Sequence, residues 1–344
     1  MRKIFCVILM FNYLLKSQNI DDLQFGTDDT FDLVSWNIEW FPKNNSTSDY
    51  VQSILTNLEA DLYALQEIED TTLLKQIVSN MPDYECYFKS SYYGGLAYVY
   101  NTNTIQVNSK YEKFTSNLYW NAFPRSPQVI DFNFMGDNYI VINNHFKCCG
   151  DGVLNLYNYN DEENRRLQAV NFLKQFIDDD LSTKKVILLG DLNDNLTDDV
   201  EHNVFQSFIN DNTNYLFTDM QIAQGSSLDW SYPSWPSHLD HILISNELFD
   251  YFQNVNSLST VIRIDDYMSG WYNYDNNVSD HRPIGLKLDI NSINYFSESI
   301  SQKRSILKVV NLLGADVKKD LSGLIIEFYD NGTVEKKFRL IPEP

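Results

Sequence analysis

The chain has 344 residues, 43% of them apolar and 14% aromatic, a composition typical of folded domains rather than of disordered chains. It carries 26 basic and 47 acidic residues, and its formal net charge is -21. Because non-specific nucleic-acid binders neutralise phosphates with lysine and arginine, this charge argues against a structural nucleic-acid-binding protein. It weighs less against an enzyme that holds an anionic substrate through bound cations.

The N-terminal segment has the pattern of a secretory signal. Arg2 and Lys3 precede an apolar run over residues 4–15, and Ser17 follows it. The run is too short for a comfortable membrane span. We therefore expect residues 1–17 to be a signal peptide, and the protein to be secreted or held at the outer cell surface without a stable membrane span. A buried N-terminal strand is the alternative.

The segment between about residues 30 and 290 alternates between apolar strands and a few amphipathic helices. Polar or charged residues follow many of the strands. The pattern predicts two packed sheets with helices outside and a site where strand ends converge. Helices are predicted over 47–59, 71–80 and 165–177, and strands over 31–38, 61–66, 94–100, 128–134, 139–144, 185–190, 238–245 and 282–288.

The last 45 residues or so change character and predict a small β module. Strands are expected over 305–314, 323–332 and 333–341, and Asn331-Gly332 is a typical hairpin turn between the last two. An edge hairpin of the main domain is the alternative.

Four cysteines occur, at positions 6, 86, 148 and 149, and Cys6 lies in the predicted signal. The other three allow one disulfide and one thiol, three free thiols, or a vicinal disulfide between Cys148 and Cys149. Small buried residues beside a strand are an equally good interpretation. The number is too small for a disulfide-stapled scaffold.

Six short strings carry the candidate chemistry, and each alone is a weak signal. Their order and their spread through the whole middle region make chance an unattractive explanation. The strings are Ser35-Trp-Asn37-Ile, Leu65-Gln-Glu67-Ile, Asn143-Asn-His145-Phe-Lys147, Gly190-Asp191-Leu-Asn193-Asp194, Ser237-His-Leu-Asp240-His241-Ile and Ser279-Asp280-His281-Arg-Pro283.

Together, the W-N, Q-E, G-D-x-N and S-D-H-x-P strings resemble those of the endonuclease/exonuclease/phosphatase superfamily over about residues 30–290. That superfamily includes DNase I-like nucleases, abasic-site endonucleases, sphingomyelinases and inositol polyphosphate phosphatases. The resemblance implies a four-layered α/β sandwich, over residues 18–295, that hydrolyses phosphate esters with the help of a divalent cation.

The resemblance also implies roles for particular residues, and their chemistry agrees with it. Asn37, Glu67 and Asp280 offer the oxygen ligands that Mg²⁺ prefers, with Mn²⁺ or Ca²⁺ as alternatives. His281 is the expected general base, or the group that positions the attacking water, and Asp240 is expected to orient it.

Four further residues complete the predicted site. His145 is expected to act as the general acid toward the leaving oxygen, although no acidic partner for it is evident in the sequence. Asp191 can orient water or hold a second cation, and Asn193 can donate to a phosphate oxygen. Arg125 lies in an F-x-R-x-P string that resembles the phosphate-contacting string of DNase I-like nucleases, with a structural salt bridge as the alternative.

The C-terminal segment, residues 300–344, resembles the sorting domains of the type IX secretion system, on the strength of its Tyr-Asp-Asn-Gly…Lys-Lys ending. The resemblance implies that the type IX machinery is a partner. The proline-containing opening common in such domains is missing.

These features predict a secreted endonuclease that hydrolyses DNA or RNA, so that nucleic acid is the expected substrate. A phosphatase or phosphodiesterase acting on inositol phosphates or sphingomyelin-like lipids is the alternative with the same site. A catalytically inactive cell-surface binding module is the alternative of another class, and it is disfavoured because every expected catalytic position holds a competent side chain. The sequence does not predict an oligomeric state.

Overall fold

The computed structural model describes residues 18–89, 94–290, 306–311, 317, 323–330 and 333–339. The predicted signal peptide lies outside these residues. The chain divides into two compact units, residues 1–291 and 292–344. Among the described helices, none combines the length and the apolar character that crossing a membrane requires.

The first unit contains two sheets of six strands each. One sheet has the order β11-β12-β1-β2-β4-β3, in which β1 and β2 are parallel neighbours. Its strands are β1 (Thr30–Phe41), β2 (Leu62–Ile68), β3 (Tyr84–Tyr87), β4 (Gly95–Asn101), β11 (Leu258–Val261) and β12 (Ile284–Asp289).

The other sheet has the order β5-β6-β7-β8-β10-β9, in which β7 and β8 are parallel neighbours. Its strands are β5 (Gln106–Glu112), β6 (Gln128–Phe134), β7 (Asp137–His145), β8 (Lys185–Asp191), β9 (Tyr215–Phe217) and β10 (Asp240–Ser245). Each sheet therefore has one parallel pair near its centre, and the carboxyl ends of a parallel pair lie at one edge of the sheet.

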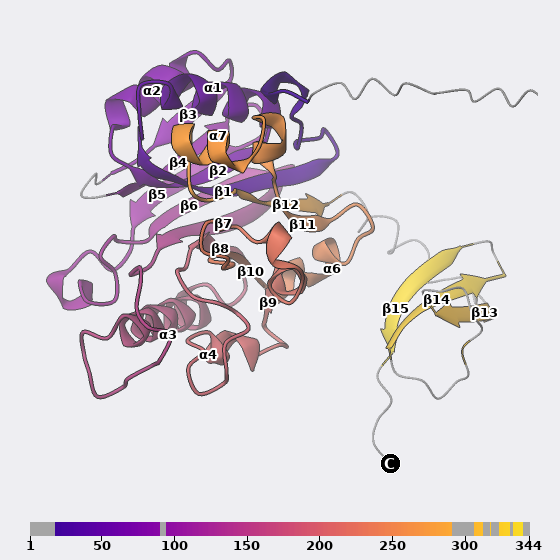
Figure 1. Cartoon of the computed structure of the whole chain (residues 1–344). Coiled ribbons are helices and arrows are strands. Elements are labelled where there is room, and N and C mark those ends of the chain that lie inside the picture. Colours follow the sequence, from indigo (N-terminus) through magenta and orange to yellow (C-terminus); the bar gives the residue numbers. More distant parts are fainter. Residues whose placement is uncertain are drawn as a thin grey trace, which may run out of the picture. The chain divides into compact units, whose positions relative to one another are not determined.

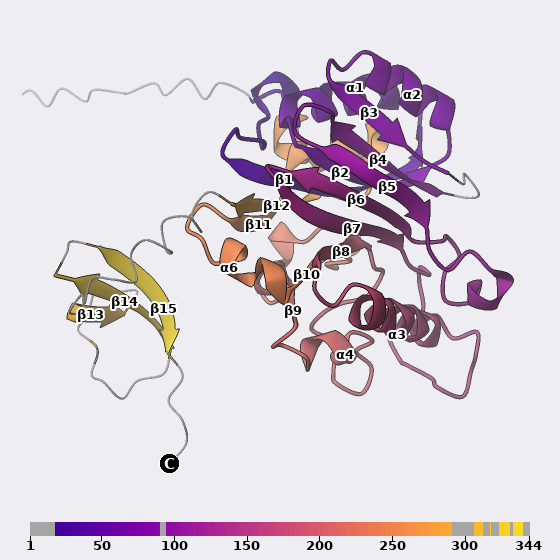
Figure 2. The same ribbon diagram turned by 180° about the vertical axis from the view of Figure 1, so that it is seen from behind.

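Helices cover the outer face of each sheet, as both views show (Figures 1 and 2). The first sheet carries α1 (Thr47–Leu58), α2 (Thr71–Ser79) and α7 (Trp271–Asn277), and the second carries α3 (Glu162–Asp180) and α4 (Gln206–Ile209). The predicted four-layered α/β sandwich is thereby confirmed. The remaining short helices are η1 (Ile20–Asp22), η2 (Asn117–Tyr119), α5 (Met220–Ala223), η3 (Ser227–Asp229), η4 (Asn246–Leu248), α6 (Phe249–Phe252) and η5 (Ile264–Tyr267).

Three apolar clusters match the three interfaces between four layers. One joins the first sheet to its helices, through residues such as Val51 of α1 and Leu65 of β2. A second joins the other sheet to α3, through residues such as Leu173 and Leu188. The third lies between the sheets and includes Phe31. Alternate residues of each central strand thus face opposite apolar layers, which explains why these strands read as almost continuously apolar in the sequence.

The predicted helices and central strands are present, but four peripheral strands were missed. These are β3, β5, β9 and β11, which are short or polar and have no continuous apolar run. In β5 no residue is buried, so its sequence has no alternation of apolar and polar residues that would predict a strand. Helix α3 begins at Glu162, three residues earlier than predicted, because the Asp161 carboxylate accepts a hydrogen bond from the N–H of Asn164 (2.9 Å) and caps the helix.

The second unit is a three-stranded antiparallel sheet in the order β13-β14-β15. Its strands are β13 (Ile306–Asn311), β14 (Gly323–Tyr329) and β15 (Val334–Arg339). A C-terminal β module is thus present as predicted. The predicted turn at Asn331-Gly332 lies outside the described residues, and the sorting role of the module remains a prediction.

Substituting Gly190, at the end of β8, is a test of how closely β7 and β8 pack at the centre of the second sheet. Its φ is +136°, and a Cβ built there would overlap the carbonyl oxygen of Asn144 on β7. We expect Gly190→Ala to lower the free energy of unfolding by more than the roughly 1–3 kcal/mol of backbone strain alone, as measured by denaturant unfolding.

The matched control is Gly136→Ala, in the turn between β6 and β7. Gly136 also has a positive φ, +89°, but nothing lies within 4 Å of an added Cβ. Equal losses of stability in the two variants would contradict the close approach of β7 and β8.

Candidate active site

The register of the second sheet places three predicted site residues side by side. His145 is the β7 partner of Asp191 on β8, and Asp191 is in turn the partner of Asp240 on β10. All three side chains are buried, with exposures of 3%, 2% and 0%. Residues more than 90 positions apart in the sequence are therefore brought into one row by backbone pairing.

The first sheet contributes Asn37 and Glu67, from the ends of the parallel strands β1 and β2. Both strands leave regular pairing here: the β1–β2 register shifts between Asn37 and Phe41, and the β2–β4 register shifts between Leu65 and Ile68. Glu67 itself has a φ of +61°. Irregularities of this kind re-aim side chains at the ends of strands, and they direct Asn37 and Glu67 toward the second sheet.

The Asn37 amide joins the two sheets. Its Nδ2 donates hydrogen bonds to Glu67 Oε1 (3.2 Å) and to Asp191 Oδ2 (2.9 Å), while its Oδ1 accepts from the Glu39 N–H (3.0 Å). The Trp40 N–H donates to Glu67 Oε2 (3.0 Å). Two carboxylates from different sheets thus converge on a single side chain.

His281 reaches the same point from the loop before β12. Its Nδ1 donates to Asp240 Oδ2 at 2.8 Å, and its Nε2 lies 3.8 Å from Asp191 Oδ2. The Ser279 hydroxyl fixes the loop by donating to the Asn37 carbonyl (2.7 Å) and accepting from the His281 N–H (3.0 Å). The expected orienting contact between Asp240 and His281 is present in the structure.

The electrostatics of His281 and Asp191 are linked. Burial alone would lower the pKa of His281, but the charges of Asp240 and Asp191 and the hydrogen bond to Asp240 outweigh it and raise that pKa to about 10. Burial raises the pKa of Asp191 to about 7, against the opposing effect of His281. The cation-free site therefore holds His281 as an imidazolium, with its charge directed at the carboxylates.

His145 has a different environment. Its Nε2 lies 3.5 Å from Asp191 Oδ2 and 3.8 Å from Glu67 Oε1, and its buried Nδ1 has no hydrogen-bond partner among the described residues. Burial, reinforced by the positive charges of Arg125 and His281, places its pKa well below the ordinary value. A neutral imidazole can donate a hydrogen bond but has no second ring proton to give to a leaving oxygen. The general-acid role of His145 therefore has no support from its environment and remains a prediction.

Asp280 lies at the rim of the site. Its Oδ1 is 4.0 Å from His281 Nε2, and its N–H donates to Glu39 Oε2 (2.9 Å). Glu39, which the sequence analysis missed, also pairs with Lys43. Burial raises its pKa, with a further contribution from Asp280. Glu39 follows Asn37 by two residues, and that spacing on β1 was the available signal.

Asn193 and Arg125 lie beside the carboxylates of the site. Asn193 has a φ of +54°, its N–H donates to Asp191 Oδ1 (3.1 Å), and its Nδ2 donates to the Phe146 carbonyl (3.3 Å). Arg125 donates from Nε to the Gly94 carbonyl (3.0 Å), beside the backbone of Glu67. These backbone contacts hold both groups close to the carboxylates.

The donor set fits a divalent cation. Glu67 and Asp191 both accept hydrogen bonds from the Asn37 amide, and Asp240 is buried on the strand beside Asp191. The buried Asp240 Oδ1 has no hydrogen-bond partner among the described residues. Asp191, Asp240 and His281 offer ligand atoms within 4.8 Å of one another. Rotating the Asn37 amide by half a turn would bring its oxygen between Glu67 and Asp191. Concentrated buried negative charge of this kind is stabilised by a cation.

A second buried network supports the site from behind. Asp219 Oδ2 accepts hydrogen bonds from His241 Nδ1 (2.6 Å) and His238 Nε2 (3.0 Å), and His241 Nε2 donates to the Asp194 carbonyl (2.8 Å). Because both ring nitrogens of His241 face acceptors, this side chain is an imidazolium paired with the Asp219 carboxylate. The pair joins the start of β10 to the loop after β8, and both histidines form hydrogen bonds in the core.

A protein-family model described as the endonuclease/exonuclease/phosphatase family matches residues 34–281. The chain belongs to this family. Membership indicates a phosphoric ester hydrolase, and the matched range contains Asn37, Glu67 and His281. No curated protein sequence matches the chain.

Solved structures of the same fold include proteins from animals and bacteria. TDP2 of D. rerio, in complex with a single-strand DNA product, has a TM-score of 0.56 and 14% identity over 76% of this chain and 99% of that one. The human Nocturnin catalytic domain, with bound sulfate, has a TM-score of 0.55 and 15% identity over 76% and 93%. An endonuclease/exonuclease/phosphatase from Bacteroides vulgatus has a TM-score of 0.54 and 11% identity over 75% and 98%. At these identities the likeness establishes the fold.

Asp219→Asn tests the buried network. Removing the carboxylate leaves the His241 imidazolium without its partner, so we expect a loss of about 3–5 kcal/mol in the free energy of unfolding at pH 7. Burial alone would raise the pKa of Asp219, but His241 and His238 lower it. The Asp219 carboxylate therefore stabilises the folded state fully above its ordinary pKa of 3.8, and this stabilisation is lost as the pH falls through the lowered pKa. The pKa of His241 is raised, so the stabilisation by its imidazolium is lost as the pH rises through the raised pKa.

The control is Asp229→Asn, whose carboxylate is 61% exposed and lies 3.6 Å from Arg263. Surface pairs of this kind contribute about 0–1 kcal/mol. Chemical denaturation of both variants between pH 4 and pH 8 makes the comparison, and a buried variant no less stable than the surface one would contradict the charged pair.

Proposed function

We propose that this protein is an exported, divalent-cation-dependent nuclease that hydrolyses phosphodiester bonds in DNA or RNA. The observation that carries the proposal is the convergence of Asn37, Glu67, Asp191 and His281 from two sheets on one buried point. A bound cation, with Mg²⁺ as the first choice and Mn²⁺ or Ca²⁺ as alternatives, would be held by Glu67, Asn37 and Asp191, with Asp280 at the rim. It would supply positive charge to the phosphoryl oxygens.

The protein groups have distinct roles in this proposal. His281, oriented by Asp240 through a 2.8 Å hydrogen bond, takes the proton of the attacking water or positions that water. Asp240 and Asp191 together raise the pKa of His281, and a cation held by Asp191 would offset part of that negative charge, which would favour the neutral imidazole as a base. His145 and Asn193 donate hydrogen bonds to phosphate oxygens, and Arg125 contacts the neighbouring phosphate.

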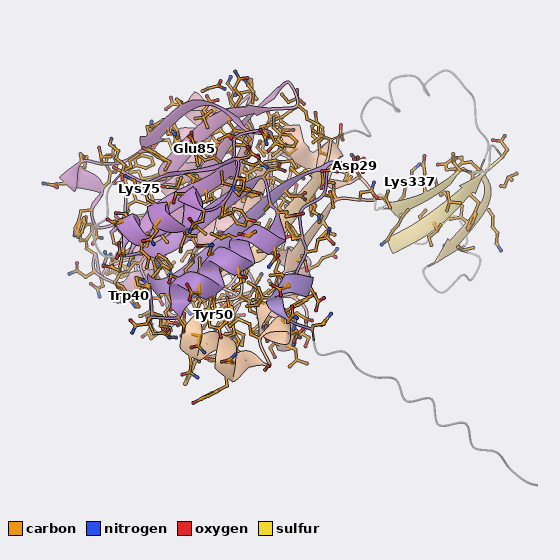
Figure 3. The ribbon with its side chains drawn as sticks, turned by 90° about the horizontal axis from the view of Figure 1, so that it is seen from above. Asp29, Trp40, Tyr50, Lys75, Glu85 and Lys337 are labelled. Atoms are coloured by element: carbon orange, nitrogen blue, oxygen red, sulfur yellow. The ribbon has the colours of Figure 1, made fainter. Side chains whose placement is uncertain are left out.

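A nucleic acid is favoured over a small phosphate ester because an exposed aromatic residue is bonded through its backbone to a residue of the site. Trp40 is 49% exposed and is labelled in Figure 3. It follows Glu39 in the chain, and its N–H donates to Glu67 Oε2. An exposed tryptophan at this point of the chain would offer a face on which a nucleobase can stack. The DNA complex of the structural neighbour TDP2 supports the same substrate class.

Export is part of the proposal on sequence grounds. The basic start and apolar run of residues 1–17 support secretion, and the Lys336-Lys337 ending of the C-terminal β module supports recognition by the type IX machinery. A nuclease outside the cell would meet nucleic acid without acting on the genome of the cell that makes it.

The first test is a substrate panel with purified protein. Plasmid DNA, single-stranded DNA, RNA, sphingomyelin and an inositol polyphosphate are each incubated with Mg²⁺, Mn²⁺, Ca²⁺ or EDTA. We expect cleavage of nucleic acid with a divalent cation and none with EDTA. Cleavage that persists in EDTA would refute the cation dependence, and turnover of lipid or inositol substrates alone would replace the nuclease by a different phosphoesterase.

The second test is mutation of the site. We expect His281→Gln and Glu67→Gln to reduce kcat with DNA by about 10²–10⁴-fold, the range for losing a positioned catalytic group. The matched control is Glu201→Gln, whose carboxylate is 78% exposed and contacts only His202 at 3.7 Å among the described ion pairs. Full activity of a site variant with native unfolding behaviour would remove that residue from the mechanism.

The third test addresses Trp40. We expect Trp40→Ala to raise KM for single-stranded DNA by about 10-fold, since stacking on one base contributes roughly 1–3 kcal/mol. Trp40→Phe keeps an aromatic face and should recover most of the affinity. An unchanged KM in Trp40→Ala would show that no base stacks there.

A further inference from the structure

The loop after β7 presents two adjacent cysteines to solvent. Cys148 and Cys149 are free and exposed, and their sulfur atoms are 2.9 Å apart. A disulfide bond measures about 2.03–2.05 Å, so the two atoms are within about 1 Å of bonding distance. Exposure separates this pair from Cys86, which is half-buried against the helical layer of the first sheet.

The backbone that carries the two thiols is anchored by a buried arginine. Arg166, 2% exposed, donates from Nη1 to the carbonyls of Lys147 (2.8 Å) and Cys149 (2.7 Å). Its other nitrogens pair with Asp194 (2.8 Å) and Glu163 (3.0 Å). Because the anchors lie on both sides of Cys148, the loop holds the two thiols together without needing a disulfide.

The conformation of the loop is also constrained at Cys149. Its φ is +71°, in the left-handed region that residues with a side chain seldom adopt. Gly150 follows with a φ of +110°, and a Cβ there would overlap the Glu163 carboxylate. A strained conformation kept by a buried ion network, at two exposed thiols, is the kind of observation from which a functional role is inferred.

The two sulfurs are chemically unequal. The Cys149 thiol donates its hydrogen bond to Cys148 Sγ, and this bond, together with burial, raises the pKa of Cys149. The Lys147 ammonium donates to Cys148 Sγ at 3.7 Å, so positive charge lies beside this sulfur. Cys148 is thus the nucleophile, and Cys149 retains its proton until the second step.

We propose that Cys148 and Cys149 form a thiol–disulfide exchange site that is oxidised to a vicinal disulfide by a disulfide of low molecular weight. The Cys148 thiolate attacks one sulfur of the external disulfide, forms a mixed disulfide and releases one thiolate. Cys149 then gives its proton to solvent and attacks Cys148 Sγ, releasing the second thiolate. One sulfur–sulfur bond forms in the protein, and the external disulfide is reduced to two thiols.

This site adjoins the candidate active site but does not depend on the proposed activity. His145 lies three residues before Cys148, and the Phe146 N–H donates to the Asp191 carbonyl (3.0 Å). Arg166 links the cysteine loop to Asp194, which follows Asn193. The redox state of the pair therefore acts on a loop that is bonded directly to the segment carrying Asp191 and Asn193.

The test uses the whole protein and oxidised glutathione as the probe. Reduced protein is equilibrated at several ratios of reduced to oxidised glutathione, the remaining thiols are alkylated with iodoacetamide, and trypsin is added. Lys147 and Arg165 flank a peptide, residues 148–165, that contains both cysteines and no other cleavage site. We expect this peptide to lose two hydrogens and to take up no alkyl group under oxidising conditions, while Cys86 remains alkylated.

Single variants provide the control. In Cys148→Ser and in Cys149→Ser the remaining thiol can form only a glutathione adduct, so the loss of two hydrogens should vanish in both, and the adduct should form faster in Cys149→Ser. Three results for the wild-type peptide would overturn the proposal. The peptide could carry two alkyl groups at every ratio, or be oxidised only to a glutathione adduct, or be oxidised only to a linked dimer. Circular dichroism checks that each variant is folded.

Discussion

The buried carboxylate of Asp191 is the group on which the arrangement of this molecule depends. It lies at the end of β8, 2% exposed, and receives Asn37 from the other sheet while two histidines approach the same oxygen. An ionised carboxylate is costly to bury unless opposite charge and hydrogen bonds compensate for it. In the cation-free site the Asn37 amide and the His281 imidazolium supply that compensation, and so hold the sheets together at this point. In the proposed cation-bound site the cation would take over the positive charge.

The polar site is surrounded by layers that fix it in place. Behind it, the ion pair of His241 and Asp219 ties the loop after β8 to β10. Beneath it, the Gln66 amide donates to Asn143 Oδ1 (2.8 Å), and Asn143 returns a hydrogen bond to the Leu65 carbonyl (3.0 Å). These contacts join the two sheets through neutral groups whose hydrogen bonds survive any change in protonation nearby. The reacting groups can therefore change charge without loosening their support.

Much of the fold and of the site could be predicted from the sequence because both are carried by central strands. Strands such as β2 and β8 are apolar runs that end near Glu67 and Asp191. The same stretch of sequence therefore predicts both the strand and the site residue at its end. The edge strands β5 and β9 could not be predicted, because they are polar or only three residues long and pairing alone defines them. Asp219 was missed for a similar reason, since a lone acid after a short strand has no distinguishing neighbours.

Other details depend on three-dimensional proximity that no local pattern encodes. The lowered pKa of His145 arises from burial and from Arg125, which lies 20 residues before it and on another segment. The role of Glu39 follows from a turn of positive φ after Asn37, through which it reaches the Asp280 N–H. Spacing in the sequence identified the candidate residues, but their protonation states were decided by what packs around them.

The division of the site between two sheets has a consequence for the chain before it folds. Asn37 and Glu67 belong to one sheet, and His145, Asp191 and Asp240 to the other, while His281 enters from a segment that follows all five in the sequence. No fragment of the nascent polypeptide carries a working set of groups, and none arises until the two halves have docked face to face. A hydrolase built in this way has no assembled active site during synthesis, and gains one only when the whole first unit has folded.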